Sequence, residues 1–510
     1  MGPSFRLLAL PLLVALAGCG TMIDDQAASP QQRLYRDAYR QISATYIDPV
    51  STEALATAGL KRLSRLDPAF AIERRGTEMV LSRGSVELQH MPAPAPDDIQ
   101  KWGSVTAQFI ATAKTASPEM AGKTDDQIDD VVLNGALTVL DRFSQYARPD
   151  AARERRAERN GFSGIGIGLE ARGPDIRITS VMADSPAGRA GLKKDDRLLS
   201  IDGKPTMNLS TSELAALLRG VPGTAVALTV MRPPASEPFS VSMARAFLIV
   251  PTVTSSHDLH NAVFHVSSFN HLTTTSLTAQ LKKVRSEMGP TLKGIILDLR
   301  NNRGGLLDQA IDMASLFLDN GTVMSITGRH PEIIKRFDTT PRGLADGLPI
   351  AVLVNGGSAS SAEVVAAALQ DTGRAVVIGS SSFGKGTAQT VLRLPNDGEL
   401  TITSARMIAP GGYSLNEHGV VPTICTADLN DQPAGVTLAL RRSLAALGAG
   451  LASRPRAMLD EAGWSELRRQ CPAQRTEPSL DLRVASRILG DSTLYRQTLG
   501  AAASAVAVAP

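Results

Sequence analysis

Residues 247–430 alternate short apolar runs with amphipathic helical patterns, and this alternation constrains the fold more than any other feature of the sequence. The apolar runs include GIILDLR, IAVLVNG and RAVVIG, and the helical patterns include SLTAQLKKVRSEM, LLDQAIDMASLFL and SSAEVVAAALQD. Such alternation is typical of βαβ units, in which helices cover a mostly parallel sheet. We therefore predict an α/β core here, within a chain of 510 residues that is long enough for several domains.

Three other regions flank this core. Residues 31–160 and 431–510 carry apolar residues at helical spacing, as in STEALATAGLKRLSRLDP and LDLRVASRILG, and both regions are predicted to be helical. Residues 161–246 instead alternate β-like runs with turns around one helical stretch, STSELAALLRG, and predict a small mixed β module. The prediction is a multidomain α+β protein.

The beginning of the chain predicts export. Arg6 precedes an apolar run that is too short to span a bilayer, which is typical of a signal peptide over residues 1–18. The sequence LAGC, ending at Cys19, resembles the bacterial lipobox, in which the cysteine is acylated. Residues 19–30 would link this lipid to the folded body, and an ordinary signal peptide is the alternative. Because Gly20 follows, we expect a periplasmic protein anchored at the inner face of the outer membrane.

Charge and cysteine content limit the classes of binding partner and cofactor that we expect. The chain has 53 basic and 50 acidic residues, so no basic field attracts nucleic acid, and the only expected membrane contact is the lipid anchor. Cys425 and Cys471 form a candidate disulfide of an exported protein, with two free thiols as the alternative. No cluster of His, Cys and acidic residues has ligand spacing, so no metal or organic cofactor is implied.

The stretch VVIGSSSFGKGTAQT nearly matches a Walker A loop, which binds nucleotide phosphates. Such a loop needs Ser or Thr after its lysine and a helix facing the phosphates. Here Gly386 follows Lys385, and TAQTVLRLPNDGELTITSARMI predicts a strand, a turn and a strand. A nucleotide hydrolase therefore stays an alternative, and Lys385 is predicted to be a buried amine.

A second motif contains serines for which such an amine could act as the base. The apolar strand IAVLV runs into Asn-Gly-Gly and then into a helix near Ala362, with Ser360 and Ser361 at the turn. A serine there has an exposed hydroxyl beside free backbone N–H groups, as a nucleophile with an oxyanion hole requires. The alternative is that these serines only cap the helix. The base would be Lys385 or, in a Ser-His-Asp triad, His418.

Taken together, NGGSASSAEV and SFGKGTAQT resemble the carboxyl-terminal-processing (tail-specific) proteases of peptidase family S41. The resemblance covers residues 125–430 and includes GIILDLRNNRGGLLDQA and ARMIAPGGYSLNEHGVVP. It implies that Ser360 is the nucleophile of a serine endopeptidase, that Lys385 is its general base and that Gln389 orients the lysine. The oxyanion that forms from the scissile carbonyl would accept hydrogen bonds from the backbone N–H groups of Ser361 and of Gly304 or Gly305.

The β module, residues 161–246, resembles the PDZ domain of the same family. The resemblance implies that its loop binds the carboxylate of a peptide while the peptide adds as a strand to the sheet edge. The predicted peptide-binding residues are Gly164, Ile165, Gly166, Ile167, Gly168 and Leu169. The implied partners are proteins or peptides with exposed carboxyl-terminal tails, and the alternative is a catalytically silent PDZ scaffold of the cell envelope.

The sequence departs from the family pattern at several positions. The usual SASASE is SASSAE here, so Ser361 stays an alternative nucleophile. The usual Asn-Pro-Gly-Gly carries Arg303 in place of proline, and an expected Asp after Pro422 is Thr423. The helical block before Asp125 is longer than in a minimal member. Homo-oligomer formation and binding of an adaptor protein are the roles considered for it.

Overall fold

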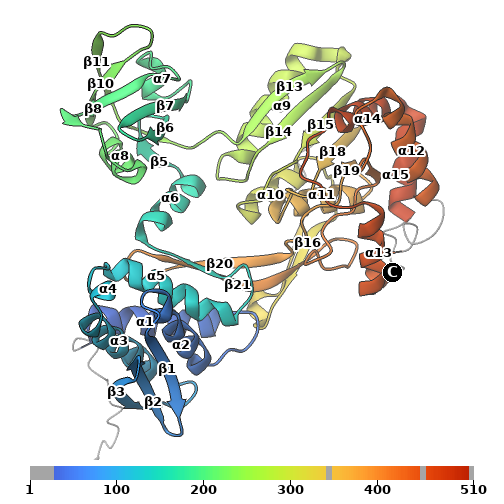
Figure 1. The fold of residues 1–510 in the computed structure, drawn as a ribbon. Helices are drawn as coiled ribbons and strands as arrows, with labels where there is room; N and C mark the ends of the chain where they lie inside the picture. Colours follow the sequence, from blue (N-terminus) through green and yellow to red (C-terminus); the bar gives the residue numbers. More distant parts are fainter. Residues whose placement is uncertain (1–27, 341–346, 448–454, 505–510) are drawn as a thin grey trace, which may run out of the picture.

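The computed structural model describes residues 28–340, 347–447 and 455–504. The predicted signal peptide, Cys19 and most of the predicted linker 19–30 lie outside these residues. Figure 1 shows three bodies, an N-terminal module in blue, the β module in green and a larger core in yellow to red. Among the helices that the structure describes, none is long and apolar enough to cross a bilayer.

The N-terminal module contains the predicted helices and also a sheet that the sequence analysis does not anticipate. Its helices are α1 (Pro30–Thr45), α2 (Thr52–Lys61), α3 (Ile99–Ala116), α4 (Pro118–Ala121) and α5 (Asp125–Ala136). The sheet is an antiparallel meander of β1 (Phe70–Arg75), β2 (Glu78–Arg83) and β3 (Val86–Pro92). Most side chains of β3 are at least partly exposed, so the strand lacks the apolar alternation that would predict it.

The β module forms one sheet with a free edge. Its strand order is β11-β10-β8-β7-β6, which leaves β6 (Ile167–Arg172) at the edge. The other strands are β7 (Asp175–Val181), β8 (Arg197–Ile201), β9 (Lys204–Pro205), β10 (Ala225–Met231) and β11 (Pro238–Ala244), with helices α7 (Pro186–Arg189) and α8 (Thr211–Leu218). Where the chain enters and leaves the module, β5 (Phe162–Gly164) pairs with β12 (Ala246–Leu248).

The core sheet has the predicted, mostly parallel arrangement. Its order is β13-β14-β15-β18-β19-β22, and only the β13–β14 pair is antiparallel. The strands are β13 (Val253–Asp258), β14 (Asn261–Val266), β15 (Gly294–Asp298), β18 (Ile350–Val354), β19 (Val376–Gly379) and β22 (Ile424–Cys425). One face packs on α9 (Thr273–Met288), α10 (Leu307–Ser315) and α11 (Ser361–Asp371).

Three C-terminal helices cover the opposite face of this sheet, namely α12 (Pro433–Leu447), α14 (Ser479–Leu489) and α15 (Ser492–Ser504). The fourth, α13 (Glu461–Gln470), instead buries Trp464 and Leu467 in the cluster that contains α9, α10 and α11. Leu480, Val484 and Ile488 of α14 are buried with Ile296 and Leu353 of the sheet. The predicted helical tail is therefore the third layer of the core, because alternate side chains of the buried strands need cover on both faces.

A long antiparallel hairpin joins the core to the N-terminal module (Figure 1). It consists of β20 (Thr387–Arg393) and β21 (Glu399–Ile408), as the sequence predicts, in a sheet with β4 (Gln145–Ala147), β16 (Thr322–Thr327) and β17 (Lys335–Asp338). Leu400 and Ile402 of β21 are buried in the core of the N-terminal module.

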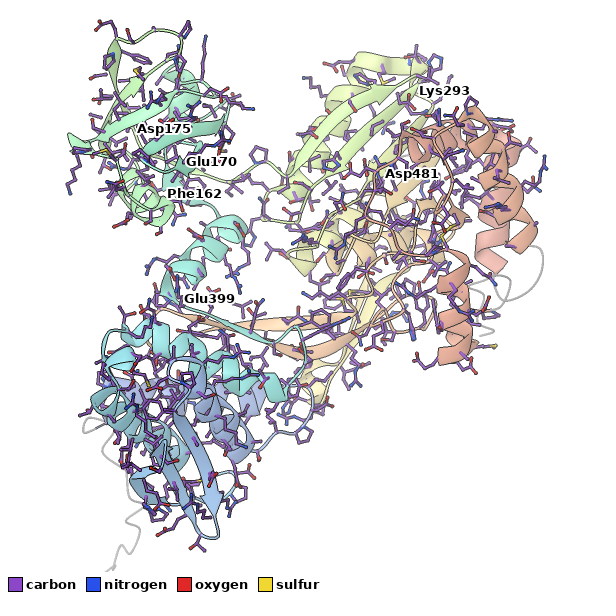
Figure 2. The ribbon with its side chains drawn as sticks, in the orientation of Figure 1. Phe162, Glu170, Asp175, Lys293, Glu399 and Asp481 are labelled. Carbon is purple, nitrogen blue, oxygen red and sulfur yellow. A yellow bond between two sulfur atoms is a disulfide. The ribbon has the colours of Figure 1, made fainter. Side chains whose placement is uncertain are left out.

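Helix α6 (Pro149–Asn160) leads from the N-terminal module to the β module and is fixed to this hairpin. Arg156 and Arg159 each place a guanidinium nitrogen 2.9 Å from the carboxylate of Glu399, whose side chain is 4% exposed. Figure 2 labels Glu399 at the hairpin end beside α6 and Phe162 at the start of the β module.

The structure links Cys425 of β22 to Cys471 at the end of α13 by a disulfide. The crosslink closes a segment with a sequence separation of 46, so it restricts the unfolded chain strongly. We expect the Cys425→Ser, Cys471→Ser double variant to lose about 2–4 kcal/mol of unfolding free energy, because the open segment regains entropy. Urea denaturation of both proteins measures this loss, and equal midpoints with equal slopes would contradict it.

Candidate active site

Ser360 lies where β18 turns into α11, with a strained backbone. Its φ is 56° and its ψ is −118°, a conformation that side-chain-bearing residues rarely adopt. Its side chain is largely buried, and its hydroxyl proton has no acceptor in the part of the chain that the structure describes. Strain of this kind persists only where the surrounding structure enforces it, and it is concentrated at functional sites.

Ser361, the alternative nucleophile, has a different environment. It is fully buried, and its hydroxyl donates a hydrogen bond to the Gly305 carbonyl oxygen at 3.0 Å. This contact ties α11 to the turn that follows β15. The geometry therefore favours Ser360 as the reactive hydroxyl and gives Ser361 a structural role.

The turn Asn302-Arg303-Gly304-Gly305 packs directly against Ser360. The Ala359 N–H donates to the Asn302 carbonyl at 2.8 Å, and a Cβ on Gly304 would lie 2.8 Å from the Ser360 Cβ. The Gly304 N–H already donates to the Asn302 side chain at 2.8 Å. The N–H groups of Gly305 and Ser361 have no acceptor among the described residues. These two N–H groups therefore fit the predicted oxyanion hole, and the Gly304 N–H, which has an acceptor, fits it less well.

Lys385 lies in the loop between β19 and β20. No helix follows it, and a Cβ on Gly386 would lie 1.7 Å from the Asn416 nitrogen. The Ser or Thr of a Walker A loop could not occupy this position. The loop geometry thus removes the basis of the nucleotide-binding alternative.

The amine of Lys385 is half-buried and faces an aromatic ring from the N-terminal module. Its Nζ lies 5.3 Å from the ring centroid of Phe143 and has no hydrogen bond or ion pair in the described residues. Burial lowers the pKa of Lys385 below its ordinary value, while the carboxylates of Asp141 and Glu363 oppose that shift. A depressed pKa raises the fraction of neutral amine, the form that can accept a proton.

One buried carboxylate connects the two motifs. Oε2 of Glu363 accepts the N–H groups of Ser360 at 2.8 Å and of Lys385 at 2.9 Å. Oε1 accepts the Gly384 N–H at 2.6 Å and the Ser382 hydroxyl. Burial raises the pKa of Glu363, and its four donors oppose that shift. The backbones of the serine and the lysine are thus held to one oxygen atom, although no hydrogen bond joins their side chains within the described residues.

Gln389, which is predicted to orient Lys385, makes its hydrogen bonds elsewhere in this structure. Its amide nitrogen donates to the Thr387 hydroxyl at 2.7 Å and to the Thr387 carbonyl at 3.1 Å. No hydrogen bond connects it to Lys385 in the described part of the chain. A local acceptor two residues away therefore satisfies the amide nitrogen of Gln389.

His418 has structural contacts instead of a contact with a serine. Its ring stacks on Trp464 of α13 with the centroids 4.5 Å apart. Its Nδ1 lies 2.9 Å from the Ser414 carbonyl and its Nε2 lies 3.3 Å from Glu461. Both ring nitrogens are therefore engaged, and this geometry disfavours the triad alternative.

The β module has a groove of about 170 Å³ beside its edge strand β6. Five of the six predicted peptide-binding residues line it, namely Gly164, Ile165, Gly166, Ile167 and Leu169. Gly168 does not, because the strand alternation turns it toward Ser180, whose Oγ would lie 2.5 Å from a Cβ there. The opposite wall, absent from the prediction, includes Thr211, Ala215, Leu218 and Arg219.

The sequence of this chain matches known protein families. Residues 260–426 match the family model of Peptidase family S41, and residues 177–232 match that of a PDZ domain. A carboxy-terminal-processing protease of Bartonella bacilliformis is 37% identical over 303 residues, which cover 59% of this chain and 70% of the relative. The chain belongs to peptidase family S41. It is a serine peptidase that carries a PDZ domain.

A second relative agrees with this family assignment. A carboxyl-terminal-processing protease of a Picosynechococcus species is 31% identical over 306 residues, which cover 59% of this chain and 73% of the relative. A solved structure, the photosystem II D1 C-terminal processing protease, is 22% identical with a TM-score of 0.39, covering 78% of this chain and 92% of that chain. The S41 assignment itself rests on the sequence matches.

Proposed function

We propose that this S41 peptidase is an endopeptidase that cuts proteins or peptides recognised by their carboxyl-terminal tails, with Ser360 as nucleophile and Lys385 as general base. The main support is the Glu363 carboxylate, which holds both backbones to one oxygen while leaving the Ser360 hydroxyl proton and the Lys385 amine without partners in the described residues. A hydroxyl and an amine kept free in this way are available to react.

In the proposed reaction, neutral Lys385 accepts the Ser360 proton as the Oγ attacks the scissile carbonyl carbon. The N–H groups of Ser361 and Gly305 stabilise the negative oxygen that forms. Lys385 then gives the proton to the leaving amine, and an acyl ester remains on Ser360. A water molecule attacks this ester while Lys385 accepts its proton, and Lys385 then returns that proton to the departing Ser360 Oγ, which releases the acid and restores the serine.

Substrate tails are proposed to bind in the groove of the PDZ domain. An extended peptide can pair with β6, whose outer edge is free, while its carboxylate meets the loop around Gly166. Ile165, Ile167 and Leu218 make the groove largely apolar, which suits an apolar last residue.

We further propose that a lipid on Cys19 holds the enzyme in the periplasm, at the inner face of the outer membrane, where it cuts envelope proteins. The sequence LAGC supports this location. Cell fractionation of wild type and Cys19→Ser, each followed by immunoblotting, tests it. A wild-type protein found only in the soluble fraction would contradict the anchor.

The test of the catalytic proposal uses two neighbouring serines. An unstructured protein with an apolar carboxyl terminus is incubated with wild type, Ser360→Ala or Ser361→Ala, and fragments are identified by mass spectrometry. We expect Ser360→Ala to be inactive and Ser361→Ala to keep activity if it stays folded by circular dichroism. Cutting by folded Ser360→Ala would refute the assignment, and folded wild type that binds tails but never cuts would favour the scaffold alternative.

The pH profile gives a prediction about the lysine. Activity should rise as pH increases through the pKa of Lys385, because only the neutral amine is a base. Phe143→Ala admits water and should raise this pKa, which moves the limb of kcat/KM to higher pH. Asp141→Asn removes a carboxylate that favours the ammonium form, and it should move the limb to lower pH.

These two variants control each other, since their expected shifts have opposite signs. Oδ1 of Asp141 accepts hydrogen bonds from the Phe143 and Ser144 N–H groups at 2.7 Å. The amide oxygen of asparagine can accept the same two bonds, so Asp141→Asn keeps the turn. Profiles of kcat/KM against pH for the three proteins measure both shifts. Unmoved limbs, or limbs that move in one direction, would exclude Lys385 as the titrating group.

A further inference from the structure

The cavity beside the nucleophile has a volume of about 520 Å³ and an unusual charge. Apart from two glycines, the residues that line it are Asn301, Arg303, Ala359, Phe383, Lys385 and Arg475. Two of these residues carry guanidinium cations and a third carries the Lys385 amine, and no Asp or Glu among the described residues lines the cavity. Ala359 directly precedes Ser360, so this cationic space adjoins the reacting hydroxyl.

Arg303 and Arg475 have no anionic partner among the residues that the structure describes. Both are exposed, and neither makes an ion pair or a hydrogen bond in that part of the chain. The carboxylates nearby have other contacts: Glu363 accepts four hydrogen bonds, Glu477 accepts one from the Asn301 side chain, and Asp428 accepts one from the Gln474 side chain. The guanidinium groups are therefore available to an anion from outside the chain.

Fixed backbones carry both arginines. Arg303 precedes Gly304, which packs on Ser360, and it follows Asn302, whose side chain donates to the Val266 carbonyl at 2.7 Å. Arg475 follows Gln474, whose carbonyl accepts the Gly356 N–H at 2.6 Å and whose N–H donates to the Ser380 hydroxyl at 3.1 Å.

Arg303 stands where the resemblance to the family leads us to expect proline, and Arg475 lies beyond residues 260–426, which match the family model. A guanidinium presents a planar pair of N–H donors that fits a carboxylate, and such charge-assisted contacts are stronger than neutral ones.

We propose that Arg303 and Arg475 bind a substrate carboxylate beside the scissile bond, so that the enzyme prefers substrates with an acidic group close to the cut. This inference rests on the proposed function, because Ser360 chemistry makes the preference visible in cleavage. The carboxylate belongs either to an Asp or Glu side chain or to the end of a short tail. The shared chemistry is an anionic carboxylate within reach of the cavity.

The test compares matched fluorogenic peptides that share one apolar carboxyl terminus. A single Glu, or a Gln in its place, is moved one position at a time across both sides of the cut. A second arm compares a short tail with a free carboxylate against the same tail as its amide. We expect at least about a tenfold higher kcat/KM for the acidic member at one position, or for the free carboxylate in the second arm.

Arg303→Gln and Arg475→Gln should each reduce this preference, and the double variant should abolish it while it still cuts the Gln peptide. Arg442→Gln, on α12 outside the cavity, is the matched control and should keep the full preference. Equal rates for acidic and neutral peptides in wild type, or an unchanged preference in the double variant, would overturn the proposal.

A binding measurement separates this proposal from the catalytic one. Affinities of Ser360→Ala for the same peptide pairs, measured by fluorescence anisotropy, do not depend on cleavage. We expect about tenfold tighter binding of the acidic member, lost when Arg303→Gln and Arg475→Gln are added. Equal affinities for the acidic and neutral peptides would refute carboxylate recognition even if the wild type cleaves well. A clear difference in affinity, together with a wild type that does not cleave, would support recognition and refute the dyad.

Discussion

Lys385→Ala is expected to lower kcat by about a thousandfold or more and to leave the protein folded. A positioned general base contributes about 10²–10⁴ to the rate, and a serine hydroxyl without one is a poor nucleophile. The Lys385 amine has no hydrogen bond or ion pair in the described residues, so its removal leaves no buried group without a partner. Single-turnover rates together with urea denaturation separate the loss of chemistry from any loss of stability.

Lys385→Arg is the matched control for this prediction. Arginine keeps a positive charge in the cavity but does not lose its proton at working pH, so it cannot act as a base. We expect the arginine variant to be about as inactive as the alanine variant. If Lys385→Arg kept a tenth or more of the wild-type rate, the amine would be acting only through its charge, and the base would have to be sought elsewhere.

Glu363→Ala is expected to abolish activity and to lower the unfolding free energy by about 3 kcal/mol or more, since each buried donor without a partner costs about 1–3 kcal/mol. The substitution leaves three backbone N–H groups and the Ser382 hydroxyl without their acceptor in a fully buried site. The strained backbone of Ser360 would also lose the contact that holds it beside the lysine loop. Urea denaturation and single-turnover cleavage measure the two losses.

Glu363→Gln refines this prediction because the amide has the same shape. One oxygen of Glu363 serves Ser360 and Lys385, and the other serves Gly384 and Ser382. The NH₂ group of glutamine cannot accept, so one of the two pairs is lost whichever way the amide is turned. Stability should lie between those of wild type and Glu363→Ala, with activity strongly reduced. Wild-type stability in Glu363→Ala would show that the donors find other acceptors.

The sequence predicted those parts of the site that depend on local pattern. The strand, turn and helix around Ser360 were predicted because an apolar run, small residues and a helical repeat follow one another directly. The strand after Gly386 was predicted from alternation around a Pro-Asn-Asp-Gly turn. Both kinds of signal lie within a few residues of the element that they predict.

The remaining features depend on contacts between distant segments. Phe143 contacts Lys385 although more than two hundred residues separate the two along the chain. Arg475 lines the same cavity as Lys385, from which it is ninety residues away. Neither residue belongs to a local pattern that marks it. The choice between Ser360 and Ser361 likewise depended on Gly305, whose carbonyl oxygen accepts only the second hydroxyl.

The layer of C-terminal helices has a consequence for the timing of folding during synthesis. Without α14, the side chains of Ile296, Leu353 and Ile378 would face water, so the catalytic half of a growing chain lacks one wall of its core. We therefore expect the active site to be completed only after α14 has been synthesised. Cleavage by nascent chains that stop before residue 478 would contradict this order. Such a peptidase is expected to stay inactive until α14 packs on the sheet, which would protect the proteins near a chain that is still being synthesised.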